Sequence, residues 1–221
     1  MELPFSVAEF FDVFFDYNQA IWPAQIVAYA LGVFAVGLTA VRSRWAGALI
    51  GAVLALFWFW DGLVYHVGFF AEINAMAFVF GGLFVLEGLL FVWATVRDRL
   101  RFSFELSAYH IIGGIFLLYA LVLYPVFGMA LGHVYPAAPV FGVAPCPMTI
   151  FTFGILLFTT RKVPLYLLAV PVLWAFTATI AAAQMGVLQD YGVSIAAVVA
   201  TGLLLYRDHA TWEPEPARLP E

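Results

Sequence analysis

The sequence has few charged residues. Only 10% of its 221 residues are Asp, Glu, Lys or Arg, and 65% are hydrophobic, whereas an ordinary soluble domain carries about 25% charged residues. A soluble protein of this size could not bury so much apolar surface, so lipid must be the solvent for much of the chain. No polar stretch is long enough to form a second domain. The composition therefore predicts a single transmembrane domain over residues 1–221.

Cysteine, lysine and histidine are also scarce, and each shortage excludes a class of protein. The one cysteine, Cys146, rules out an intramolecular disulfide. The one lysine, Lys162, falls in a loop, so no retinal Schiff base can form within a span. Four histidines are too few for a seven-helix zinc amidase of the ceramidase type. The first residues lack a basic segment before an apolar core, so we expect no cleaved signal peptide.

Seven apolar stretches predict an all-α membrane protein with seven transmembrane helices. The stretches cover residues 21–41, 47–67, 74–96, 108–131, 147–160, 163–185 and 189–206. Every Lys and Arg follows the first, third, fifth or seventh stretch, and short basic loops stay cytoplasmic. The N-terminus is therefore expected outside, followed by a seven-helix bundle over 21–206 and a cytoplasmic tail over 207–221. A six-span alternative omits the short fifth stretch.

Residues 1–20 carry acidic residues and no basic ones. Glu9, Asp12 and Asp16 lie three and four residues apart, which places them on one helical face with phenylalanines opposite. This pattern predicts an interfacial amphipathic helix on the outer membrane surface. Because the segment lacks the Lys and Arg that attract anionic lipid, it could instead pack over the bundle.

A weak internal repeat relates the two halves of the chain. Pro23, Ile26 and Phe34 recur as identical residues 124 positions later, and four residues of the second stretch recur 117 positions later in the sixth. Stretches one to three and five to seven would run in the same sense, with the fourth as the connector. That order permits a 3+1+3 parallel repeat like that of small sugar facilitators. The alternative is chance, because identities among apolar residues are common in so apolar a chain.

The fifth stretch is the most informative about a site. Pro145 and Pro147 should block regular helix before them, and residues 147–160 then span only about 21 Å at 1.5 Å per residue. The helix must start below the outer surface, which predicts an outward-facing vestibule with Thr149 and Thr152 near its floor and the loop 132–146 as its lid. The helix N-terminus would favour an anion or a thiolate at Cys146. The alternative is a small buried hydrophobic residue there.

Further polar residues fall at the same level in the predicted bundle. Asp61 is the strongest candidate for a functional residue among them, because no cationic residue lies near it in sequence. Tyr65, four residues on, could satisfy its carboxylate. His66 lies about 140° from it around an ideal helix, which argues against a pair and suggests a histidine facing water. The predicted ligand-binding residues are Asp61, Tyr65, His66, Asn74, Tyr124, His133, Cys146, Thr149 and Gln184.

Two further interpretations use the same polar residues. His66, His133 and Cys146, with Asp61, have the chemistry for zinc or copper, although no pair has tight ligand spacing. Glu87, in the middle of the third stretch, is a candidate for proton coupling or a structural hydrogen bond to a neighbouring helix. The sequence indicates no particular cofactor.

Several short sequence segments resemble those of a known family. They are Leu3-Pro4-Phe5, Tyr17-Asn18, Trp22-Pro23-Ala24-Gln25, Tyr65-His66 with Phe69-Phe70 and Ile73-Asn74, Tyr135-Pro136, and Pro145-Cys146-Pro147-Met148-Thr149-Ile150-Phe151-Thr152-Phe153-Gly154. Together they resemble a bacterial membrane family catalogued as domain of unknown function 6064, over nearly the whole chain. The resemblance implies a multi-pass protein of the bacterial inner (plasma) membrane and carries no activity.

The sequence therefore favours a small transporter or small-ligand-binding membrane protein that uses the outward vestibule. The alternative is a membrane-embedded metal-binding protein or enzyme that uses His66, His133, Cys146 and Asp61. An assembly, chaperone or sensory role is also open. The expected partners are the lipid bilayer and a small solute or ion, and a homo-oligomer is a further candidate. No nucleic-acid partner is expected.

Overall fold

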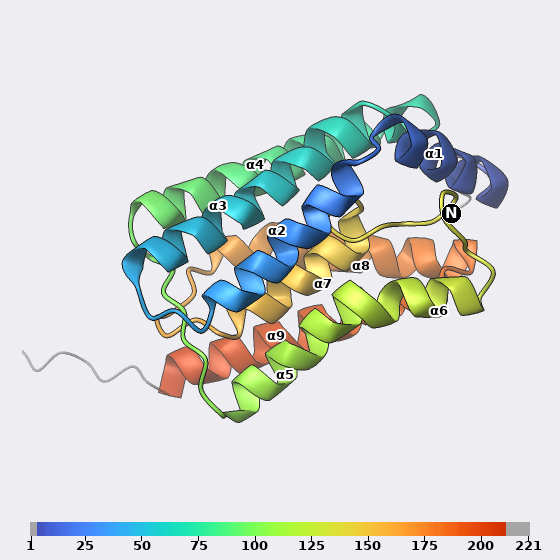
Figure 1. Cartoon of the computed structure of the whole chain (residues 1–221). Helices are drawn as coiled ribbons and strands as arrows, with labels where there is room; N and C mark the ends of the chain where they lie inside the picture. Colours follow the sequence, from blue (N-terminus) through green and yellow to red (C-terminus); the bar gives the residue numbers. More distant parts are fainter. Residues whose placement is uncertain (1–3, 211–221) are drawn as a thin grey trace, which may run out of the picture.

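The structure of the chain is a computed structural model that describes residues 4–210, and over these residues the secondary structure is helical (Figure 1). The one β-bridge among them is isolated and joins Phe102 to Thr159. The expected tail, 207–221, is described only to Ala210, where the last helix ends. The elements are α1 (Val7–Ala20), α2 (Ala24–Leu38), α3 (Arg44–Trp60), η1 (Asp61–Val67), η2 (Phe70–Glu72), α4 (Ala77–Val96), α5 (Ala108–Leu118), η3 (Tyr119–Leu123), α6 (Tyr124–Ala130), α7 (Pro145–Leu156), α8 (Tyr166–Met185), η4 (Leu188–Asp190) and α9 (Tyr191–Ala210).

Five of the described helical segments are long and apolar enough to cross a membrane. They are Arg44–Glu72, Ala77–Val96, Ala108–Ala130, Tyr166–Met185 and Leu188–Ala210. A sixth span is counted if α1 and α2, which meet at a bend of 86°, are one broken span. The expected fifth span is α7, a 12-residue helix that is about 18 Å long and too short to cross alone. The structure therefore confirms that several helices are long and apolar enough to cross a membrane, but it does not confirm the expected count of seven.

Helix α1 has the predicted amphipathic pattern. Ser6 caps it, because the Ser6 side chain accepts from the Glu9 backbone N–H while the Glu9 side chain accepts from the Ser6 N–H. The acidic side chains of α1 are exposed, and Phe10, Phe14 and Tyr17 on the other face are buried. Tyr17 donates a 2.6 Å hydrogen bond to the Val143 carbonyl. The apolar face of α1 therefore packs on the rest of the protein.

Helix α7 is enclosed by the other helices, and every one of its residues is buried. It packs against α5, α8 and α9 (Figure 1). At the crossing with α5, a Cβ on Gly113 would lie 2.9 Å from the Gly154 carbonyl oxygen, and a Cβ on Gly154 would lie 3.1 Å from that of Gly113. The two glycines thus let the two backbones approach closely. On another side, Trp58 Nε1 of α3 donates to Thr152 Oγ1 at 3.3 Å.

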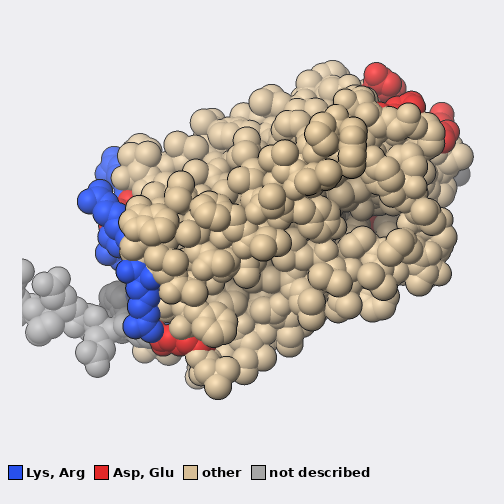
Figure 2. All heavy atoms as spheres, viewed as in Figure 1, with Lys and Arg blue, Asp and Glu red and all other residues tan. Residues whose placement is uncertain are grey.

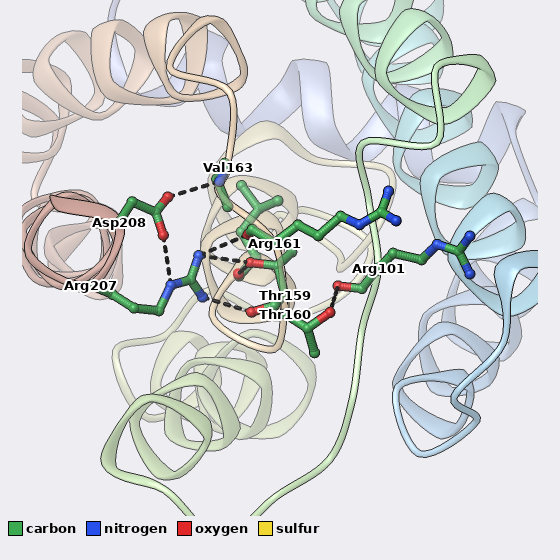
Figure 3. A network of polar contacts seen from close by, with 8 residues as sticks. Arg101, Thr159, Thr160, Arg161, Val163, Arg207 and Asp208 are labelled. Carbon is green, nitrogen blue, oxygen red and sulfur yellow. Dashed lines mark hydrogen bonds and ion pairs between the residues drawn. The ribbon is translucent and has the colours of Figure 1, made fainter. Parts of the chain in front are cut away.

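The segment that follows α7 is held by the end of α9. Arg207 donates from Nη1 to the Thr159 carbonyl at 2.7 Å and from Nε to Asp208 Oδ1 at 2.8 Å (Figure 3). Asp208 in turn accepts from the Val163 backbone N–H at 2.8 Å. On the other side of the segment, the Thr160 N–H donates to the Arg101 carbonyl at 2.8 Å. These bonds tie the end of α7 to the connections around it.

The two halves of the chain pack differently. In the first half, α3 packs against both α2 and α4, which make few or no contacts with each other, whereas in the second half α7, α8 and α9 all pack against one another. Helix α2 is peripheral and exposes Ile26 and Val33, whereas its expected counterpart α7 is wholly buried. The 3+1+3 repeat is therefore not confirmed, which agrees with the alternative that the identities arise by chance.

Charged residues gather at opposite ends of the molecule. Lys and Arg cluster at one end, which we call the basic end, and Asp and Glu of α1 lie toward the other, the acidic end (Figures 1 and 2). The four ion pairs among the described residues all involve arginines of the basic end. There the hydrogen bond from Arg101 holds the pKa of Asp98 below its ordinary value. Between the ends, large apolar side chains such as Phe176 (66% exposed) and Val198 (76% exposed) face outward, as expected of a surface in contact with lipid.

The glycine crossing of α5 and α7 gives a direct test of this packing. Gly113→Ala should lower the free energy of unfolding by about 1–3 kcal/mol, because the added methyl group meets the Gly154 carbonyl and the Phe158 ring. Gly114→Ala is the matched control, because nothing lies within 4 Å of its Cβ position, and it should be neutral or stabilising by up to about 1 kcal/mol. Thermal unfolding in detergent measures both, and equal effects would contradict the packing.

Candidate functional site

Two π-helical segments lie toward the acidic end. Segment η1 continues α3, and η3 joins α5 to α6. π-Helical turns are rare and are frequently found at functional sites. Segment η1 packs closely on α4, since a Cβ on Gly62 would lie 2.9 Å from the Gly81 carbonyl oxygen and a Cβ on Gly81 2.8 Å from that of Gly62. Tyr65 of η1 and Tyr124, directly after η3, both line the same cavity.

This outer cavity has a volume of about 310 Å³. Its walls come from α1, η1, η2, α4, α8 and the N-terminus of α7, and most of its lining is apolar and aromatic. The apolar lining includes Phe5, Phe10, Phe14, Phe70, Phe80, Trp174, Ile180 and Met185, and the polar lining includes Tyr65, Asn74, Tyr124, Cys146, Thr177, Gln184 and Asp190. No Lys, Arg or His lines it among the described residues. Its size and apolar character are those of a small-molecule pocket.

The polar end of the outer cavity is built around Asp190. This residue directly precedes α9 and is 4% exposed. The Tyr124 hydroxyl donates to Asp190 Oδ1, and the Cys146 thiol lies within hydrogen-bonding reach of the same carboxylate. Cys146 stands in the first turn of α7, and a carboxylate near a helix N-terminus is favoured by the helix dipole. Asp190 is thus held by a hydroxyl, a thiol and a helix end.

The N-terminus of α7 offers few groups to an anion other than Asp190. Pro145 and Pro147 have no N–H, and the Met148 N–H already donates to the Ala144 carbonyl. Only the Cys146 N–H remains of the groups that usually face an anion, and Asp190 lies beside it. An anionic ligand at this helix end stays a prediction, and it would have to compete with the Asp190 carboxylate. An occupant with a donor or a positive charge fits the carboxylate better.

Asp61 and His66 form a second polar cluster, the buried cluster, behind the cavity wall. These two residues and Thr149 are fully buried, and none of the three lines the outer cavity. His66 Nδ1 lies 2.8 Å from the Asp61 carbonyl oxygen, so the neutral ring carries its proton there and leaves Nε2 as an acceptor. Both Asp61 carboxyl oxygens, His66 Nε2 and Thr149 Oγ1 have no hydrogen-bond partner among the described residues. The expectations that Tyr65 satisfies Asp61 and that His66 faces water are therefore wrong.

The predicted site residues thus do not all lie in one place. Tyr65, Asn74, Tyr124, Cys146 and Gln184 line the outer cavity, and Asp61 and His66 form the buried cluster. Thr149 is buried within α7. His133 lies apart from the outer cavity and from the buried cluster. Its ring stacks on Phe11 with centroids 4.4 Å apart, and its Nδ1 lies 3.2 Å from Gln189 Nε2.

The structure does not assemble the predicted metal site. Within residues 4–210, no group of three or more His, Cys, Asp or Glu side chains is placed to hold a metal ion. His66 is packed between Phe84 and Trp174, whereas Cys146 faces Asp190 and His133 lies on Phe11. These three residues are therefore not a ligand set. Glu87 is buried in α4 without a hydrogen-bond partner among the described residues, and its proton-coupling role stays a prediction.

The most important residue missed in the predicted set is Asp190. Its position could have indicated it, since it is the one acidic residue at the start of the seventh apolar stretch, 189–206. Trp174 and the phenylalanines of α1 were also missed. They look like ordinary apolar residues of a helix face, and only the packing of α1 over the bundle brings them to the cavity.

The family model for a family of unknown function, DUF6064, matches residues 7–212. The chain belongs to this family. The match confirms the resemblance noted from the sequence and includes both π-helical segments and all residues that line the outer cavity except Pro4 and Phe5. Comparison with curated proteins and with solved structures finds no match. Membership of DUF6064 therefore assigns no activity, and function must be argued from the cavity.

Removing the hydrogen bond between Tyr124 and Asp190 is the first test of the site. Tyr124→Phe should lower the free energy of unfolding by about 1.5–3 kcal/mol, because a buried carboxylate loses its hydroxyl donor. Tyr119→Phe is the control, since the Tyr119 hydroxyl donates to a backbone carbonyl, that of Gln189, at 2.8 Å and should contribute only about 0.5–1.5 kcal/mol. Thermal unfolding in detergent compares them, and a larger loss at Tyr119 would contradict this account.

Proposed function

We propose that the protein binds a small, mostly apolar molecule with an amine group in the outer cavity. The observation that supports this most strongly is the carboxylate of Asp190 at one end of an apolar, aromatic cavity that no basic side chain lines. An ammonium group can donate to the carboxylate and lie against aromatic faces. An anionic ligand would meet the negative charge of Asp190 and no compensating cation.

The packing below the cavity favours binding over passage through the bundle. Helix α7 runs from the cavity toward the basic end, and its residues Ile150, Phe151 and Phe153 are fully buried. A solute would have to displace this core to cross. We therefore place a ligand-binding role ahead of a transporter, which would need a second conformation.

The proposal can be tested with octylamine as the probe on protein in lipid nanodiscs. Octylamine should bind and should slow the labelling of Cys146, the only cysteine in the chain, by a small methanethiosulfonate reagent. Octan-1-ol and octanoate should protect Cys146 less, because they lack the positive charge. Asp190→Asn should weaken octylamine binding by roughly tenfold or more, since a charge-assisted hydrogen bond contributes about 1.5–3 kcal/mol.

Asp16→Asn is the matched control for that test. It removes a negative charge from exposed α1 at the same end of the molecule without touching the cavity. It should leave octylamine binding within about twofold of the unmodified protein. Equal protection by all three probes, or an equal loss in both variants, would contradict an amine site at Asp190.

We further infer that α2 and α7 complete a seven-helix bundle in the bacterial inner membrane, with the acidic end outside. The gathering of Lys and Arg at one end supports this orientation, because basic connections stay cytoplasmic (Figure 2). The outer cavity would then open to the side away from the cytoplasm.

The orientation predicts where reporters will be active. A reporter fused after Arg207 should be cytoplasmic, and one inserted at Asn74, between η2 and α4, should be external. Paired alkaline phosphatase and green fluorescent protein fusions measure this, because the first is active only outside and the second only inside. The same side for both positions would contradict the topology.

A further inference from the structure

We propose that the basic end carries a site for one anionic phospholipid between α4 and α8. A hollow of about 400 Å³ lies there, lined by the end of α4 and the start of α8. Three of its lining residues, Arg97, Arg99 and Lys162, are basic, and none is acidic. We call it the basic hollow. It lies at the other end of the molecule from the outer cavity and does not depend on that cavity's ligand.

The charges that face the basic hollow favour a phosphate group. The acidic residue nearest in sequence, Asp98, accepts from Arg101 Nη2 at 2.6 Å and also pairs with Arg161. Among the described residues no ion pair joins Arg97 or Arg99 to a carboxylate. Both arginines are exposed, and arginine and lysine are the side chains that bind phosphate oxygens most readily. A phosphate would therefore find two arginines, Arg97 and Arg99, whose acidic neighbour Asp98 is already engaged.

An apolar groove continues from the basic hollow along α4. It is lined by Leu89, Leu90, Val92, Trp93 and Val96, and Trp93 belongs to both the groove and the hollow. Residues 89, 92, 93 and 96 recur at helical spacing, so the groove follows one face of α4 for about 10 Å. Leu89 and Val96 are exposed. An acyl chain can lie in this groove while its headgroup occupies the hollow.

The aromatic residues at the junction also suit a lipid headgroup region. The guanidinium carbon of Arg97 lies 4.2 Å from the centroid of a Trp93 ring, and Tyr166 lines the far side of the hollow. Tryptophan and tyrosine concentrate where the membrane meets water. Basic pockets between helices on the cytoplasmic side are suited to anionic lipid headgroups. The combination of groove, aromatic rings and cations points to a phospholipid in preference to free phosphate.

Native mass spectrometry of the full chain can test the site, with phosphatidylglycerol and phosphatidylcholine of identical acyl chains as probes. The protein should retain phosphatidylglycerol at least about fivefold more than phosphatidylcholine. The double substitution Arg97→Gln/Lys162→Gln should reduce this preference to within about twofold. Arg42→Gln/Arg44→Gln removes the same charge from exposed residues of the same end that do not line the hollow, and should keep the preference.

Two further measurements keep the test decisive. Excess inorganic phosphate should not displace phosphatidylglycerol, and Leu89→Asp, which places a charge in the groove, should lower its retention severalfold. Circular dichroism should show unchanged helix content in every variant. The site is overturned if both double variants lose the preference equally, if phosphate displaces the lipid, or if the groove is instead covered by a second copy of the chain, seen as a dimer without lipid.

Discussion

The enclosure of α7 is the constraint on which the rest of the structure depends. A helix of 12 residues cannot span a bilayer, so its ends lie inside the protein and their backbone groups must be satisfied there. At its start, two prolines remove N–H groups that would otherwise need partners. After its end, Arg207 donates to the Thr159 carbonyl, and the Arg101 carbonyl accepts from the Thr160 N–H. Gly113 and Gly154 then let α5 pack closely against α7.

The same enclosure explains why the outer cavity is where it is. Because α7 begins at Pro145, below the ends of the longer helices, the space above it is closed by α1 and by the loop before α7, whose Pro139 and Ala144 line the cavity. The floor of that space is the first turn of α7, where Cys146 meets Asp190. A polar group at this depth is costly without partners, and Tyr124 and Cys146 reduce that cost for Asp190. The cavity thus exists because α7 starts deeper in the bundle than the longer helices around it.

The sequence was sufficient to predict a short helix at this position and several of the polar residues near its start, such as Tyr124 and Cys146, because prolines and length are local signals. It was insufficient where a π-helix changes the geometry. On an α-helix His66 would point about 140° away from Asp61, but within η1 its ring reaches the Asp61 carbonyl. The ligand set of His66, His133 and Cys146 failed for a related reason, since chemistry and membrane depth do not specify which way a side chain faces. The repeat is not confirmed, and identities among apolar residues say little about which helix is central.

Helices α4 and α8 connect the two ends of the molecule. They pack against each other, and both contribute to the outer cavity through Phe80 and Trp174 and to the basic hollow through Trp93 and Tyr166. Between those contributions α8 contains Pro171, which removes one backbone hydrogen bond and clashes with the preceding turn. The outer cavity and the basic hollow are therefore two faces of one pair of packed helices, and the relative position of α4 and α8 sets the shape of both.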